Sequence, residues 1–329
     1  MSFLLSLFLG FVPMLINAAW VYWLDRFEQE PKRLLGFVFL WGAFVAAAGA
    51  LIFNTIWEAG LFILTNSERL SSLTTYVISA PIVEEFLKGL AVLFIFLLYR
   101  HEFDSIMDGI VYAAITALGF AATENTLYIY EKGYLTDGYS GLFALAFIRV
   151  VIVGWQHPFY TAFIGIGLAV ARLSRSSFGQ FSAPILGFSA AVFTHSLHNL
   201  ISSINPSIQT CLLGTLIDWS GWLAMFLFVL YTVHRERQLL ITFLKEEVDL
   251  GTLTEAQLYQ AASFTHRIFD PLVNLFGGRY SLVRRFYQIC GELAHKKAQY
   301  AQLGNEIDNQ KRIEAYRTEL ATVSRLLSG

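Results

Sequence analysis

The chain has 329 residues, of which 55% are hydrophobic and 15% charged, and its formal net charge is −2. Its mean hydropathy is +0.53. Water-soluble globular proteins rarely contain so few charged residues, so the composition excludes an ordinary soluble enzyme and predicts an integral membrane protein. We expect the lipid bilayer and other proteins as partners, and no nucleic acid.

Seven apolar runs are long enough to cross about 30 Å of hydrocarbon, for which a helix needs about 20 residues. They lie near residues 3–24, 34–64, 74–99, 106–130, 141–172, 183–203 and 211–233. The second and fifth runs are longer than one span, and Pro158 lies within the fifth, so we expect tilt, a kink or a re-entrant segment there. The sequence thus predicts an all-α membrane helix bundle of about seven spans.

Positive charges lie mainly in connections on one side of this predicted bundle. That side has Arg26, Lys32, Arg33, Arg100, Arg172, Arg175, Arg235 and Arg237, whereas the other has Arg69 and Lys132. Because cytoplasmic loops carry the excess of Lys and Arg, we predict the N-terminus outside and the C-terminus in the cytoplasm. Charge density rises at His234, so residues 1–233 are predicted as the membrane domain and 234–329 as a cytosolic tail of two or three amphipathic helices. Its last helix, near residues 291–327, is polar enough to be solvated or to self-associate.

Four consecutive predicted spans contain polar side chains. An ionisable side chain at membrane depth costs about 2.5 kcal/mol or more unless it is paired or faces a wet cavity, so such residues are functional candidates. We predict that they line one water-filled pocket that opens to the outside. Arg149 (near Asp137 or Glu131), Glu58 and Asp218 are expected to lie near the interfaces or to snorkel toward them. The candidates are Glu84, Glu85 and Lys88; Glu124 and Asn125; Gln156 and His157; and His195, His198 and Asn199.

Helical spacing separates the two adjacent glutamates. At 100° per residue, Glu84 and Glu85 point 100° apart, and Lys88, one turn further on, projects between them. One carboxylate can therefore face the pocket while Lys88 balances the charge of the other.

The sixth predicted span adds His195, His198 and Asn199. His195 and Asn199 are one helical turn apart and His198 is offset, so all three are expected to face the same pocket. In such a pocket a carboxylate can act as general base for water, a histidine can donate to a leaving amine, and an asparagine amide can stabilise an oxyanion. Together these groups suit amide hydrolysis.

Other interpretations of the polar residues stay open. The ionisable residues of the third span also suit a structural ion cluster or an ion pathway. Glu124 with Asn125 suits hydrogen bonding between helices, and His157 can satisfy carbonyls freed at the adjacent proline. His195 and His198 with one of the glutamates form a donor set for catalytic zinc. Apart from that alternative, no cofactor is expected.

The motifs and their order resemble the PrsW family of bacterial intramembrane proteases, which are relatives of the CAAX prenyl-protein proteases and of a multi-span subunit of gamma-secretase. The resemblance covers roughly residues 15–235 and departs at Ala113 and Ala117, where the family pattern has glycines. The motifs are EEFLK at 84–88, DGIVYAAITALGFAATEN at 108–125, HPFYTAFIGIGLA from 157 and HSLHN at 195–199.

The resemblance implies a glutamate-dependent protease of the bacterial inner (plasma) membrane. Its substrate would be a membrane-anchored protein, such as an anti-sigma factor, cleaved in or near the outer side of its span. A proton-coupled or ion-coupled transporter and a non-catalytic scaffold that binds a partner helix stay open as alternatives. The residues that match the family's motifs as catalytic are Glu84, Glu85, Glu124, His195 and Asn199, with Lys88, Asn125, His157 and His198 as supporting residues.

Overall fold

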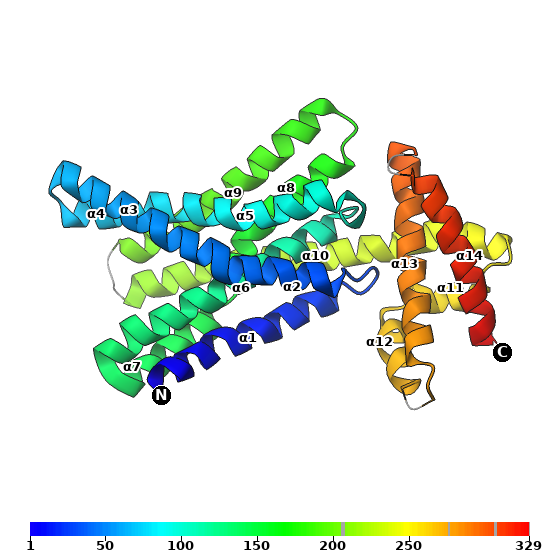
Figure 1. Cartoon of the computed structure of the whole chain (residues 1–329), viewed down its shortest axis with the longest axis horizontal. Coiled ribbons are helices and arrows are strands. Elements are labelled where there is room, and N and C mark those ends of the chain that lie inside the picture. The colour runs from blue at the N-terminus through cyan, green and yellow to red at the C-terminus, as the bar shows by residue number, and fades with distance from the viewer. Residues whose placement is uncertain (205–207, 276, 306–307, 329) are drawn as a thin grey trace. The chain divides into compact units, whose positions relative to one another are not determined.

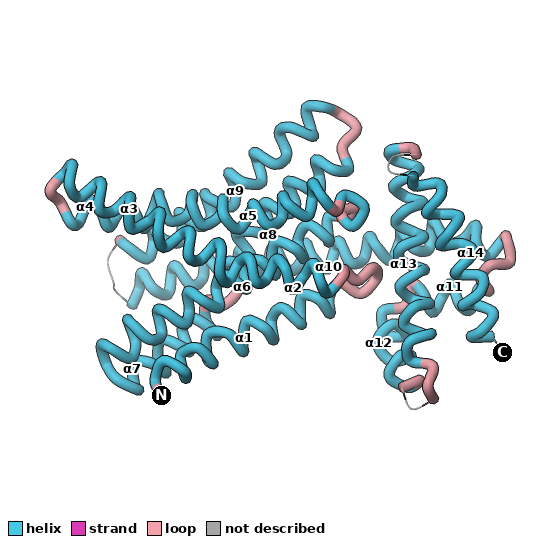
Figure 2. Tube along the Cα trace, viewed as in Figure 1, coloured by secondary structure: helices cyan, strands magenta, loops and turns pink. Residues whose placement is uncertain are grey.

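The computed structural model describes residues 1–204, 208–275, 277–305 and 308–328, and within these ranges the chain forms helices and loops without a strand (Figures 1 and 2). The predicted all-α fold is therefore confirmed. The chain divides into two compact units, one formed by Met1–Val21 with Pro31–Leu227 and the other by Tyr22–Glu30 with Phe228–Gly329.

The first unit is a bundle of long helices, several of which contain a π-helical segment, labelled η; η3 is a 3₁₀ turn. In chain order they are α1 (Ser2–Leu24), α2 (Lys32–Leu40), η1 (Trp41–Ala46), α3 (Ala47–Thr65), α4 (Glu68–Thr74), η2 (Thr75–Ser79), α5 (Ala80–Leu98), η3 (Arg100–Glu102), α6 (Ile106–Tyr128), η4 (Ile129–Tyr134), α7 (Leu135–Phe147), η5 (Ile148–Ile152), α8 (Gln156–Leu173), α9 (Ser177–Ser203) and α10 (Ile208–Asp249), which continues into the second unit.

Four stretches of the described chain are long and apolar enough to cross a membrane: Ser2–Leu24, Lys32–Thr65, Ile106–Leu173 and Leu213–Asp249. The third of these comprises several helices, α6 to α8, and is too long for a single crossing. The helix α5 is also apolar over most of its length, but its three charged residues, Glu84, Glu85 and Lys88, set it apart from these four stretches. The chain is thus a membrane protein, whereas the count of seven spans stays a prediction.

The fifth predicted run, 141–172, is divided into two helices. η5 ends at Ile152, and α8 begins at Gln156. Pro158 lies in the first turn of α8, where its missing N–H removes no helical hydrogen bond. The expected kink therefore exists, and it precedes the proline.

The helix α6 is the centre of the first unit, because it is buried on all sides over most of its length. Glycines let its neighbours approach closely. A Cβ on Gly119 would lie 2.0 Å from the carbonyl oxygen of Phe39 in α2, and one on Gly109 would lie 2.3 Å from that of Gly165 in α8. Small residues allow such backbone contact between membrane helices. Ala113 is fully buried and would meet a Cβ on Gly165 at 3.0 Å, so alanine is accommodated there in place of the expected glycine.

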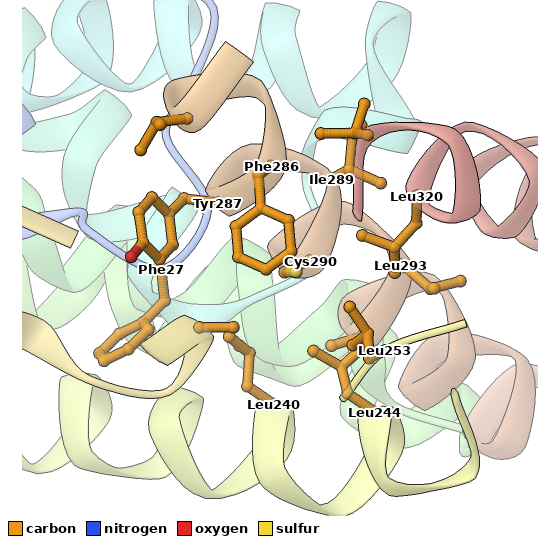
Figure 3. Packing of buried hydrophobic residues seen from close by; sticks show 14 residues of the cluster. Phe27, Leu240, Leu244, Leu253, Phe286, Tyr287, Ile289, Cys290, Leu293 and Leu320 are labelled. Atoms are coloured by element: carbon orange, nitrogen blue, oxygen red, sulfur yellow. The ribbon is translucent and has the colours of Figure 1, made fainter. Parts of the chain in front are cut away.

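The second unit is a helical domain with its own hydrophobic core (Figure 3). It contains the end of α10, then α11 (Glu255–Ala261), α12 (Phe264–Val273), α13 (Tyr280–Leu303) and α14 (Asn309–Ser328). The single helix expected near residues 291–327 is wrong, because α13 ends before Gly304, whose φ of +77° suits glycine, and α14 packs back along it (Figure 1).

The short segment Tyr22–Glu30 belongs to this second core. Phe27 is 1% exposed and packs in the cluster that contains Leu240, Phe286 and Cys290 (Figure 3). Arg267 donates to the carbonyl oxygen of Phe27 at 2.8 Å. The connection between α1 and α2 is therefore part of the tail domain.

Candidate functional site

Glu85 is the most completely hydrogen-bonded carboxylate of the first unit's polar cluster. It is fully buried on α5 and has three partners from three helices. Lys88 Nζ donates to Oε1 at 2.6 Å, Thr161 Oγ1 donates to Oε2 at 2.8 Å, and His195 Nδ1 lies 3.0 Å from Oε1. A carboxylate with this many donors is held in the charged form and in one orientation.

Glu84, the preceding residue, has no such partners. Its Oε2 is buried without a hydrogen bond and lies 3.8 Å from Lys88 Nζ and 3.9 Å from His195 Nε2. Both distances exceed a hydrogen bond. Because Glu85 accepts from Nδ1 of His195, the lone pair of that ring is on Nε2, on the side of Glu84. The two groups thus face one another at 3.9 Å, beyond hydrogen-bond distance.

Lys88 and His157 connect the glutamates of α5 to Glu124 of α6. Lys88 Nζ lies 3.2 Å from His157 Nδ1 and 4.3 Å from the centroid of the Phe120 ring. An ammonium group only donates, so Nδ1 accepts and the ring proton is on Nε2. That nitrogen lies 2.8 Å from Oε2 of Glu124, to which it donates.

Glu124 has a second partner that the sequence analysis did not assign to it. Arg149 in η5 donates to Glu124 and also, through Nε, to Oδ1 of Asn125 at 2.8 Å. Its guanidinium lies over the Tyr128 ring, 4.3 Å from the centroid. The expected pairing of Arg149 with Asp137 or Glu131 is therefore wrong, whereas its depth in the membrane stays a prediction. Its charge balances that of Glu124 within the cluster.

His198 lies in a separate group beside this cluster. Its Nδ1 is 2.9 Å from Oδ2 of Asp218, which also accepts from Gln156 Nε2 at 2.6 Å. Asp218 is buried. The sequence analysis expected it near an interface and therefore did not include it in a polar network. The ring of Tyr160 lies between the two groups, stacked on His195 at 4.8 Å and 6.3 Å from His198. His195 and His198 therefore do not face one site.

Asn199 forms a hydrogen bond to the backbone of the segment that precedes α5. Its amide nitrogen donates to the carbonyl oxygen of Tyr76 at 2.7 Å. Tyr76 lies in η2, directly before α5, and a π-helical segment changes the helical pairing of nearby carbonyls. The bond therefore ties α9 to the start of the helix that carries both glutamates.

Within this cluster, Glu84, His157 and His195 could hold a metal ion, because their donor atoms all lie within 4.8 Å of one another. His157 replaces His198 in the donor set considered from the sequence. Two histidines and a carboxylate suit catalytic zinc. However, the lone pair of His157 is directed at Lys88, so a cation would have to displace this ammonium group.

Comparisons with known proteins identify the family of the chain. Residues 30–233 match the family described as PrsW family intramembrane metalloprotease. The chain belongs to the PrsW family. The matched range contains every residue of the polar cluster.

Two curated relatives are each named Protease PrsW. The one from Geobacillus kaustophilus is 28% identical over 166 residues, which are 50% of this chain and 66% of the relative. The one from Clostridioides difficile is 36% identical over 131 residues, which are 39% of this chain and 52% of the relative. The chain thus spans less than two thirds of the length of these relatives. No solved structure matches.

Proposed function

We propose that this PrsW family member is an intramembrane endopeptidase that hydrolyses a peptide bond of a membrane-anchored protein. The observation that carries the proposal is the pair of unlike glutamates: Glu85 has three donors, while Oε2 of Glu84 is buried without a partner opposite His195. An unsatisfied buried carboxylate costs free energy, so such a group persists where function requires it.

Glu84 is the general base in this proposal. A water molecule held between Oε2 of Glu84 and Nε2 of His195, which are 3.9 Å apart, is polarised from both sides. As its oxygen attacks the scissile carbonyl carbon, Glu84 takes one proton. The carbon–nitrogen bond then breaks, and the proton returns to the leaving nitrogen through His195.

The neighbouring residues hold these two groups in position. Glu85 orients the His195 ring, as a carboxylate does for a catalytic histidine, and Lys88 keeps Glu85 ionised. Glu124 orients His157, and Arg149 balances the charge of Glu124. We assign Asn199 a positioning role rather than contact with the substrate carbonyl, because its amide already binds Tyr76. His198 is assigned to the separate group with Asp218.

We propose that this reaction proceeds without a metal ion. Zinc held by Glu84, His157 and His195 would supply a Lewis acid for the peptide carbonyl, and the donor types fit it. The contact of Lys88 with two of these three residues opposes a cation there. Elemental analysis of active, purified protein is expected to show no stoichiometric zinc. Stoichiometric zinc that is lost together with activity would contradict the metal-free mechanism.

We place the protein in the bacterial inner membrane, with its N-terminus outside and cleavage near the outer side of the substrate's span. An anti-sigma-factor-like protein is the substrate class that the family resemblance favours. The test is mass spectrometry of membrane-protein fragments from cells that contain the wild-type protein, the Glu84→Gln variant or, as a matched control, Glu58→Gln. Fragments that depend on Glu84 and not on Glu58 are expected. Identical fragments in all three, together with a proton or ion flux in proteoliposomes, would favour a transporter.

A further inference from the structure

The helix α12 of the tail domain exposes apolar side chains on one face. Phe269, Leu272 and Val273 are 55%, 53% and 76% exposed, and Leu275, just beyond the helix, is 50% exposed. We call these four side chains the α12 patch. At 100° per residue the three helical members lie roughly 140° to 240° from Arg267, on the opposite side of the helix. Exposed apolar side chains grouped in this way mark an interaction surface.

The buried face of α12 is attached to the end of a membrane span. Arg267 donates to the carbonyl oxygens of Arg26 and Phe27 at 2.9 and 2.8 Å. Phe264, the first residue of α12, packs edge to face against Trp23, with ring centroids 5.3 Å apart. Trp23 is the penultimate residue of α1, whose length and apolar character suit a membrane crossing.

These contacts join α12 to the segment that directly follows the apolar part of α1. Tryptophan is enriched at the level of the lipid headgroups. The guanidinium carbon of Arg26 lies 5.6 Å from the centroid of the Trp23 ring, and such a pair of an aromatic ring and a cation suits that level. A lipid surface offers the apolar environment that these exposed side chains lack in the protein. Arg279, which is exposed and follows the patch, can contact anionic headgroups.

We propose that α12 lies in the membrane interface and inserts the α12 patch into the lipid surface. The helix is short, so it is an auxiliary anchor: it fixes the tail domain against the bilayer beside the end of α1. The proposal rests on the chain being a membrane protein and does not depend on protease activity.

The test uses the full chain in vesicles of phosphatidylethanolamine and phosphatidylglycerol with brominated acyl chains. An environment-sensitive fluorophore is attached at Phe269→Cys or Val273→Cys in a Cys211→Ser background, in which Cys290 is fully buried. Ala315→Cys, on an exposed position of α14, is the matched control. Severalfold stronger quenching by the lipid bromines is expected at Phe269 and Val273 than at Ala315.

Further outcomes test whether the patch contacts the lipid surface or another occupant. Replacing Leu272 and Val273 by aspartate is expected to abolish the quenching of the label at Phe269→Cys, because charged side chains do not enter the hydrocarbon. Quenching equal to that at Ala315→Cys would overturn the proposal. Disulfide cross-linking of two chains through Val273→Cys would also overturn it, in favour of a second copy as the occupant.

Discussion

Glu84 and Glu85 are adjacent in the sequence but differ in their surroundings, because Glu85 accepts three hydrogen bonds whereas Oε2 of Glu84 accepts none. The difference follows from the helical projection of α5, which turns one carboxylate toward Thr161 and Lys88. It separates a carboxylate that holds the site together from one that is available for chemistry.

Conservative replacement of the two glutamates is expected to affect stability differently. Glu85→Gln leaves the ammonium of Lys88 fully buried beside a neutral amide, which should destabilise the protein by about 3–5 kcal/mol. Glu84→Gln removes no hydrogen bond at Oε2 and should cost about 1 kcal/mol or less. Thermal unfolding midpoints in detergent measure both. Equal losses of stability would contradict the division of roles.

Arg149 and Glu124 are expected to act as a coupled pair. Arg149→Gln leaves Glu124 without its guanidinium partner, so stability and cleavage should both fall, whereas Glu124→Gln in addition should restore part of the stability. In a double-mutant cycle the interaction free energy is expected to be about 1 kcal/mol or more. Arg149→Lys, which keeps the charge but not the bond to Asn125, is the control. Strict additivity would show that the pair does not interact.

The backbone contact between η1 and α6 gives a steric prediction with a control nearby in the chain. A Cβ on Gly42 would lie 2.0 Å from the carbonyl oxygen of Thr116, whereas one on Gly36 in α2 would meet nothing within 4 Å. Gly42→Ala should destabilise the protein by about 1–3 kcal/mol. Gly36→Ala should be neutral or stabilising by up to about 1 kcal/mol, because alanine favours the helix. The thermal unfolding midpoints of both variants test this difference in stability. Equal midpoints would mean that η1 and α6 can move apart at little cost.

Cys290 provides a pH-dependent probe of the tail domain. Burial raises the pKa of its thiol to about 12 from 9.0. The native thiol is therefore protonated at pH 8, whereas the thiol of the unfolded tail is partly ionised, so alkylation should be about a thousandfold slower in the native state. The same shift means that stability falls as pH rises from 9 toward 12, because the native state binds more protons there. Labelling kinetics of the Cys211→Ser protein measure the first effect.

The same probe tests whether residues 22–30 belong to the tail core. Phe27→Ala creates a cavity in the cluster that contains Cys290, at a cost of about 3–5 kcal/mol, and should accelerate alkylation. Leu250→Ala, at an exposed position, is the control. Unchanged kinetics for Phe27→Ala would separate this segment from the tail core.

The sequence predicted the helices and the members of the cluster because their signals are local. Apolar length predicted the long helices, and i, i+4 spacing placed Lys88 near Glu84. The partner of Glu124 was missed because Arg149 approaches it only after the chain reverses at Gly138, whose φ of +63° and ψ of −146° interrupt α7. No spacing rule relates residues that lie on either side of such a turn.

Phe27 was missed for a related reason. It lies in a short connection between spans, where an aromatic residue ordinarily indicates the membrane interface. Its partners Leu240 and Phe286 are more than 200 residues away in the sequence, so no spacing rule relates them. Likewise, the sequence grouped His195 with His198, and the tertiary position of Asp218 on α10 separates them.

The most direct test of the central claim is a cleavage assay with purified protein and a single-span substrate, identified from the cellular fragments, in liposomes. The Glu84→Gln variant is compared with wild type and with Glu58→Gln, after thermal unfolding has shown that all three are folded. We predict cleavage by wild type and Glu58→Gln and none by Glu84→Gln. Cleavage by folded Glu84→Gln at the wild-type rate would contradict the assignment of Glu84 as the base.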